Sequence, residues 1–241
     1  MNNKNVQFNS DTNILGGVPD YATMIQYVVA SLDNSVASDF SFRTEKAGKR
    51  FIAAIDRSIL TFKNDEHKRI ILSAFSSNDL RFDQKLIVLF WQLCINNKLF
   101  ALITENYFMK SVFAGRLSLL ADEIMSYLYQ LRSSYPDELQ WSDATLKITA
   151  SKYLTVMKKL GLALGTQNKV IKYPVIGDEV FEILVRLALN VYPEEPTGTN
   201  PLFSFSFLDK AGFINKIKSI KFTNKWTVMQ LGNNIKIELL S

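Results

Sequence analysis

The absence of proline between Pro19 and Pro136 is the feature that most constrains the fold. Proline interrupts helices, so a long stretch without it leaves continuous helices possible. Within this stretch, apolar residues recur at helical spacing over residues 21–132. The apolar segments are short and closely spaced, which favours a globular bundle of about five or six helices over a coiled coil.

The segment from Ser142 to Ile176 has a different pattern. Ser142 is suited to cap a helix that runs through ATLKITASKYLTVMKKL and ends at Gly161, where glycine permits a left-handed stop. LALG and the turn residues 166–168 then lead into KVIKYPVI, which is typical of a small β-hairpin. A helix followed by a hairpin predicts a winged-helix-like DNA-binding module.

The local charge of this segment favours nucleic acid. Between Trp141 and Ile176 there are six lysines and a single acidic residue, Asp143. The whole chain has 28 basic and 23 acidic residues, a net charge of +5 that carries little weight by itself. A basic helix followed by a basic hairpin, however, suits a phosphate-lined groove.

The predicted helix has an apolar core face and a polar, basic face. The core face consists of Leu146, Ala150, Tyr153, Met157 and Leu160. The residues that we predict to bind DNA are Ser142, Thr145, Lys147, Ser151, Lys152, Thr155, Lys159, Asn168, Lys169 and Lys172. The first helical turn is placed to reach base edges, and the later lysines to contact phosphates. No Arg, Asn or Gln lies between Ser142 and Gly165, which predicts weak sequence preference.

The chain as a whole is predicted to be mainly α, in four parts. These are a flexible N-terminal tail at 1–18, a helical bundle at 19–135, a winged-helix-like module at 136–192 and a short α+β extension at 193–241. Residues 178–191 form a helix that could complete the module. In the extension, phenylalanines alternate with other residues and lysines are frequent. This pattern fits a stacking platform for single-stranded nucleic acid, but more often a buried strand.

Residue types argue against catalysis, and we expect no catalytic residues, no metal and no cofactor. The chain has one cysteine, Cys94, and one histidine, His67, which sits in an exposed-looking run of charged residues. Neither a His/Cys metal site nor an intramolecular disulfide can be built from them. There is no GxxxxGK[ST] or GxGxxG motif. No signal-peptide pattern and no apolar run long enough for a membrane span is present, so we expect a cytoplasmic protein without a membrane partner.

Three stretches resemble the BrxA family of BREX bacteriophage-exclusion systems. They are FRTEKAGKRFIAAIDRSILTF, LIVLFWQLCINNKLFALITENYF and LQWSDATLKITASKYLTVMKKLGLALG, within residues 40–190. The resemblance implies a NusB-like helical bundle, a winged-helix-like part, and binding of duplex DNA within a multi-protein phage-defence system. By position, Trp141, Ser142, Thr145 and Lys147 would open the recognition helix, with residues 168–172 in the wing. The final forty residues depart from the family pattern.

Two alternative functions remain open at this point. The lysine face could dock an acidic partner protein of the defence complex, which would make the chain a scaffold. The bundle could instead bind RNA, as NusB does, through basic residues at the start of its early helix: Arg43, Lys46, Lys49 and Arg50.

Overall fold

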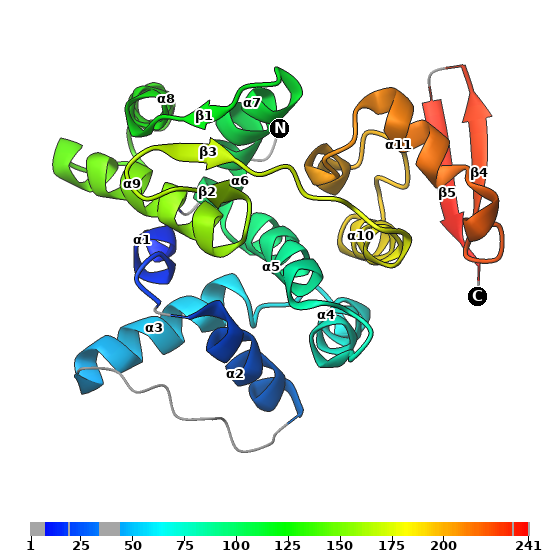
Figure 1. Ribbon diagram of the computed structural model, residues 1–241, viewed down its shortest axis with the longest axis horizontal. Coiled ribbons are helices and arrows are strands. Elements are labelled where there is room, and N and C mark those ends of the chain that lie inside the picture. Colours follow the sequence, from blue (N-terminus) through cyan, green and yellow to red (C-terminus); the bar gives the residue numbers. More distant parts are fainter. Residues whose placement is uncertain (1–7, 19, 34–43, 233, 241) are drawn as a thin grey trace. The chain divides into compact units, whose positions relative to one another are not determined.

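The computed structural model describes residues 8–18, 20–33, 44–232 and 234–240 of the 241-residue chain. The protein is mainly helical, with two small antiparallel sheets, which confirms the predicted class (Figure 1). The helices are α1 (Asp11–Leu15), α2 (Tyr21–Asp33), α3 (Glu45–Ser58), α4 (Asp65–Ser76), α5 (Phe82–Asn96), α6 (Lys98–Ile103), the π-helix η1 (Thr104–Met109), α7 (Lys110–Phe113), α8 (Ala121–Ser134), α9 (Asp143–Lys159), α10 (Asp178–Val191), the 3-10 helices η2 (Pro201–Phe205) and η3 (Ile220–Phe222), and α11 (Lys210–Ile217). The strands are β1 (Ser118–Leu119), β2 (Ala163–Leu164), β3 (Lys169–Ile171), β4 (Trp226–Leu231) and β5 (Asn234–Leu239).

The chain forms two compact units, each assembled from two stretches of sequence. The first contains Met1–Thr61 and Arg81–Tyr173, and the second contains Phe62–Leu80 and Pro174–Ser241. These limits differ from the predicted ones. Helix α4, expected in the bundle, packs against α10 in the second unit, so α10 does not complete the module that contains α9. The cause is non-local packing, which apolar periodicity along the chain does not encode.

Helix α5 forms the centre of the first unit. Every residue from Leu86 to Cys94 is buried, so this helix is surrounded on all sides rather than on one face. The buried amide of Gln92 donates to the carbonyl of Ile59 at 2.6 Å, just past the end of α3. Asn96 donates to the carbonyl of Thr61 at 2.9 Å. The polar side chains of α5 thus satisfy carbonyls that the end of α3 leaves without helical partners.

Helix α9 is anchored in the same core. All five predicted core-face residues are buried. The ring of Tyr153 lies 5.4 Å from that of Phe100, and its hydroxyl is 3.1 Å from the hydroxyl of Thr104. Burial raises the pKa of Tyr153 well above its ordinary value. A buried hydroxyl needs a partner, so this contact fixes the rotation of α9 about its own axis.

The ends of α9 follow the predicted signals. The Ser142 hydroxyl accepts from the backbone N–H of Thr145 at the N-terminus. At the other end Gly161 has φ +73°, and the N–H of Leu162 donates to the carbonyl of Met157. This is the hydrogen bond of a helix that ends on a left-handed residue.

A hairpin follows α9, but it uses different residues from those predicted. Ala163–Leu164 pairs with Lys169–Ile171 across a turn at 165–168, and residues 172–176 form no strand. On its other side β3 pairs with β1, giving the order β1-β3-β2. Strand β1 precedes α8 and was not predicted, because a two-residue strand leaves no recognisable pattern in the sequence. The order along the chain is therefore helix α6–α7, β1, α8, α9, β2, β3.

The N-terminal segment is folded where it is described. We predicted a flexible tail over 1–18, but residues 11–15 form α1 and Leu15 and Val18 are buried. The carboxylate of Asp11 is 1% exposed and receives two hydrogen bonds from Arg57 of α3, at 2.5 and 3.0 Å. A buried charge requires such pairing. Residues 1–7 lie outside the described part of the chain.

The second unit packs around Phe181 of α10. Its ring lies 5.7 Å from Phe213, 5.6 Å from Phe222 and 6.3 Å from Trp226. Phe203 and Phe205 are buried as well, so most phenylalanines of the C-terminal extension form a core rather than a stacking platform for nucleic acid, and only Phe207 is half-exposed. Strands β4 and β5 pair as an antiparallel hairpin. His67, expected at the surface, is fully buried and accepts from the N–H of Lys63.

No single helix in the described ranges is both long and apolar enough to cross a membrane. The helices Phe82–Asn96 and Lys98–Phe113 pass that test only as a pair, and they are bent by 108°.

The turn of the β2–β3 hairpin depends on Gly165. Its φ is +93°, and a Cβ added there would lie 2.1 Å from the carbonyl oxygen of Asn168. We expect Gly165→Ala to lower the free energy of unfolding by roughly 2–3 kcal/mol, from backbone strain and the clash. Urea unfolding followed by circular dichroism would measure it.

Gly115→Ala is the matched control. Gly115 has φ +67°, but no atom lies within 4 Å of the added Cβ. This variant should lose only about 1 kcal/mol, the cost of the left-handed backbone itself. Equal losses in the two variants would contradict the close approach of Gly165 to Asn168.

Candidate nucleic-acid interface

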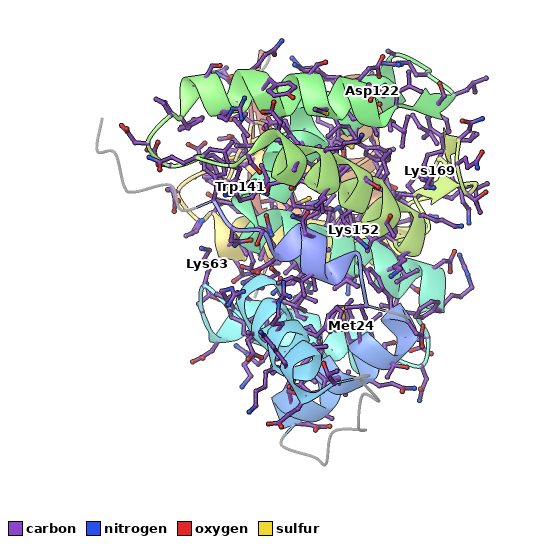
Figure 2. All side chains as sticks on the ribbon, turned by 90° about the vertical axis from the view of Figure 1, so that its left-hand side faces the viewer. Met24, Lys63, Asp122, Trp141, Lys152 and Lys169 are labelled. Atoms are coloured by element: carbon purple, nitrogen blue, oxygen red, sulfur yellow. The ribbon has the colours of Figure 1, made fainter. Side chains whose placement is uncertain are left out.

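The surface of α9 divides into three strips along the helix. One faces the core, one faces α1, and one is open. Figure 2 shows α9 crossing between α8 and α1, and both of these helices pack against it. The open strip is formed by Ala144, Lys147, Ile148, Ser151, Thr155 and Lys158, most of them exposed.

The open strip contains two lysines and one available hydroxyl. Lys147 and Lys158 are exposed and have no ion-pair or hydrogen-bond partner among the described residues. Thr155 donates its hydroxyl to the carbonyl of Ser151 at 3.0 Å. The hydroxyl of Ser151 has no partner among the described residues and remains free to donate to an external acceptor. Two cations and a hydroxyl along one helix face can contact several phosphates of one duplex.

Helix α1 covers the strip that contains Lys152 and Lys159. A Cβ placed on Gly16 would lie 3.0 to 3.2 Å from atoms of Lys152, so α1 and α9 are in close contact there. The ammonium of Lys159 donates to the carbonyls of Gly16, at 3.0 Å, and Val18. It also lies 5.7 Å from the ring centre of Tyr21. Lys159 therefore ties the N-terminal segment to α9.

The electrostatics of Lys159 agree with this structural role. Burial lowers the pKa of its ammonium, and the neighbouring charge of Lys152 lowers it further. We predicted Lys159 as a DNA contact, but two of the three N–H donors of its ammonium are bonded to the backbone of residues 16–18. The adjacent Lys158 is the exposed residue. The two lysines differ in role because a segment more than a hundred residues away in sequence packs on one of them.

The N-terminal end of α9 has fewer free hydrogen-bonding groups for DNA than predicted. The hydroxyls of Ser142 and Thr145 lie 3.0 Å apart, and that of Ser142 also caps the helix. The carboxylate of Asp143 accepts from Arg132 of α8 at 2.9 Å, which offsets its negative charge. Both hydroxyls are thus engaged locally.

The two lysines of the hairpin segment differ in position. Lys169 lies on β3 and, because side chains alternate along a strand, shares a face with the buried Ile171. Lys172 follows the strand and is exposed. Burial and the charge of Lys158 on α9 both lower the pKa of the Lys169 ammonium. Its ammonium donates to the carbonyl of Thr166 within the turn. Figure 2 shows Lys169 beyond one end of α9.

The structure thus brings together part of the predicted set. Lys147, Ser151, Thr155 and Lys158 are the polar residues of the open strip, and Lys169 lies on the neighbouring hairpin. We call these five residues together the α9 strip. Asn168 is exposed in the turn, and Lys172 is exposed beyond the end of β3. Among the described residues, no group of three His, Cys, Asp or Glu side chains is placed to hold a metal ion.

A second basic surface lies in the first unit, on the far side of α1. Helices α1 and α3 border a groove of about 680 Å³. It is lined by Ser10, Ile14, Glu45, Lys46, Lys49, Arg50, Ala53 and Arg57. Three of the four residues named for the RNA alternative are in this lining; Arg43 lies outside the described residues.

Comparison with known proteins adds nothing to this geometry: no protein-family model matches the chain, and no curated protein matches it either.

The same substitution at Lys159 and at Lys158 separates the structural role of Lys159, attachment of residues 16–18 to α9, from the loss of a lysine charge. We expect Lys159→Met to lower the free energy of unfolding by about 1–2 kcal/mol, because the carbonyls of Gly16 and Val18 lose a charged donor. Limited proteolysis should then cut residues 8–18 faster. Urea unfolding and mass spectrometry of the fragments would measure both effects.

Lys158→Met is the control, since it removes the same charge from the neighbouring exposed position. This variant should unfold and be cleaved like the original protein. If Lys159→Met matched it in both assays, the attachment of α1 through Lys159 would be disproved.

Proposed function

We propose that this protein is a non-enzymatic DNA-binding protein that contacts duplex DNA through the α9 strip, with low sequence specificity. The observation that carries the proposal is the open strip itself. It is an exposed helical face with two unpaired lysines, Lys147 and Lys158, and the hairpin beside it carries Lys169, whose ammonium is bonded to the carbonyl of Thr166. Phosphate contacts of this kind give affinity and register without reading bases.

The order of elements supports a winged-helix interpretation. A helix, a short strand, two helices and a hairpin follow one another, and β3 lies between β1 and β2. In this interpretation α9 is the recognition helix and residues 165–168 form the tip of the wing. The connection between α8 and α9, residues 135–142, is longer than the three- or four-residue turn of a simple helix-turn-helix. The assignment therefore depends on the strands as much as on the helix pair.

The composition of the strip supports low specificity. Bidentate recognition of bases is made mainly by Arg, Asn and Gln, and none of these lies on α9. Ser142 and Thr145, which were predicted to reach base edges, are bonded to each other. The resemblance to the BrxA family would place this activity in a cytoplasmic phage-defence complex with other proteins, and the NusB-like bundle belongs to the same proposal.

A second candidate function, docking of a partner protein, is favoured by apolar side chains on the outer face of the three-stranded sheet. Leu164 is 53% exposed and Val170 is 42% exposed, and they are direct partners across the hairpin. Substituting Leu164 and Val170 by Ser would separate the two candidates, since it would reduce capture of the other defence proteins while leaving DNA binding unchanged.

The proposed function predicts the behaviour of Lys147→Glu/Lys158→Glu. Fluorescence anisotropy with duplex DNA should show affinity falling by roughly ten- to a hundredfold at low salt. The slope of log affinity against log salt should become shallower by about two, because two phosphate contacts are lost. Single-stranded DNA and RNA of matched sequence would be titrated in parallel.

Lys98→Glu/Lys110→Glu provides a control with the same charge change on α6 and α7, outside the strip. It should alter affinity only slightly. Equal losses from both double variants would mean that net charge alone drives binding. No duplex binding by the original protein at low salt would refute the proposed function.

A further inference from the structure

The groove between α1 and α3 is the strongest basic feature that the α9 strip does not include. Its lining contains four cationic side chains, Lys46, Lys49, Arg50 and Arg57, and one acid, Glu45. Such a concentration of positive charge around one concavity is typical of an anion-binding surface.

The four cations are not equally available. Arg57 is committed to the buried carboxylate of Asp11, and Lys49 pairs with Glu45 at 2.5 Å, both side chains being more than three-quarters exposed. Lys46 and Arg50 are exposed, and neither has an ion-pair or hydrogen-bond partner among the described residues. They are four residues apart on α3 and so lie on the same face of the helix. The groove thus presents two free cations side by side.

The position of the groove relates it to the α9 strip. Helix α1 packs against α9 on one side and α3 on the other, and all three helices belong to the first unit (Figure 2). Packed helices lie about 8–10 Å apart, which puts the axes of α3 and α9 roughly 16–20 Å from each other. That span corresponds to about five or six base pairs along a duplex, well within the reach of a single bound DNA.

The surface between the two sets of cations would not repel DNA. The one acidic residue of α1, Asp11, is buried and neutralised by Arg57. On the side of α9 the aliphatic part of the Lys152 side chain lies against Gly16, at the end of α1. A phosphate backbone crossing α1 would therefore meet positive charge on both sides and no uncompensated negative charge on the helix itself.

We propose that the groove between α1 and α3 is a second phosphate-binding site, which holds the backbone of the same duplex DNA that the α9 strip contacts. Lys46 and Arg50 make the contacts, and α1 joins the two basic surfaces into one continuous face. This inference rests on the proposed function.

The test is Lys46→Glu/Arg50→Glu, measured against the Lys147→Glu/Lys158→Glu and Lys98→Glu/Lys110→Glu variants on a duplex of about 20 base pairs over a salt series. We expect affinity to fall about tenfold or more and the salt slope to become shallower by about two, with Lys98→Glu/Lys110→Glu close to the original protein. Thermal unfolding should be unchanged, because neither substituted side chain has a partner in the described structure.

Glu45→Gln tests the same site in the opposite direction. It removes the only acid among the described residues that line the groove and frees Lys49, so binding should become a few-fold tighter. A gain in affinity cannot be produced by misfolding.

The outcomes separate the two proposals. If Lys46→Glu/Arg50→Glu binds duplex DNA normally while Lys147→Glu/Lys158→Glu does not, the groove inference is overturned and the proposed function stands. Loss of RNA binding alone in Lys46→Glu/Arg50→Glu would also overturn it, since the groove would then serve another nucleic acid. Failure of the original protein to bind duplex DNA would refute both the proposed function and the groove inference.

Discussion

The buried carboxylate of Asp11 constrains the whole basic face of the first unit. An ionised group at 1% exposure must be compensated, and Arg57 does so with two hydrogen bonds, aided by the hydroxyl of Ser58 at 3.3 Å. This pairing fixes α1 on α3. Lys159 then attaches the residues after α1 to α9 from the other side. The Asp11–Arg57 pair on the side of α3 and the Lys159 contacts on the side of α9 therefore determine which basic side chains remain available to a ligand.

The same contacts explain how a helix as short as α1 can form. A five-residue helix has too few internal hydrogen bonds to persist alone, so its stability must come from packing and side-chain contacts. Burial of Leu15 and Val18 supplies the apolar part. Its polar contacts are incomplete, because the side-chain oxygens of Thr12 and Asn13 are buried without partners. Among the helices of the basic face in the described chain, α1 is thus the one with buried polar atoms that lack hydrogen bonds, so we expect local unfolding of this face to begin at α1.

Local signals in the sequence sufficed for the helix that carries the α9 strip. Ser142 and Gly161 mark its ends because capping and left-handed stops involve only neighbouring residues. Apolar spacing likewise identified the buried face of α9. Strand β1 could not be predicted, since its structure comes from pairing with β3, which lies about fifty residues later. The packing of α4 against α10 could not be predicted either, because it also joins segments that are far apart in the sequence.

The availability of each lysine was the part of the candidate site that the sequence could not determine. Lys158 and Lys159 are adjacent and chemically identical, and the helical period separates them by about 100°. That rotation turns Lys159 toward the backbone of residues 16–18 and leaves Lys158 in the open strip. On β3, alternation likewise puts Lys169 on the same face as the buried Ile171, whereas Lys172 lies beyond the end of the strand and is exposed. A count of lysines gives the charge of a segment, but only the packing of distant segments decides which of those charges can meet a phosphate.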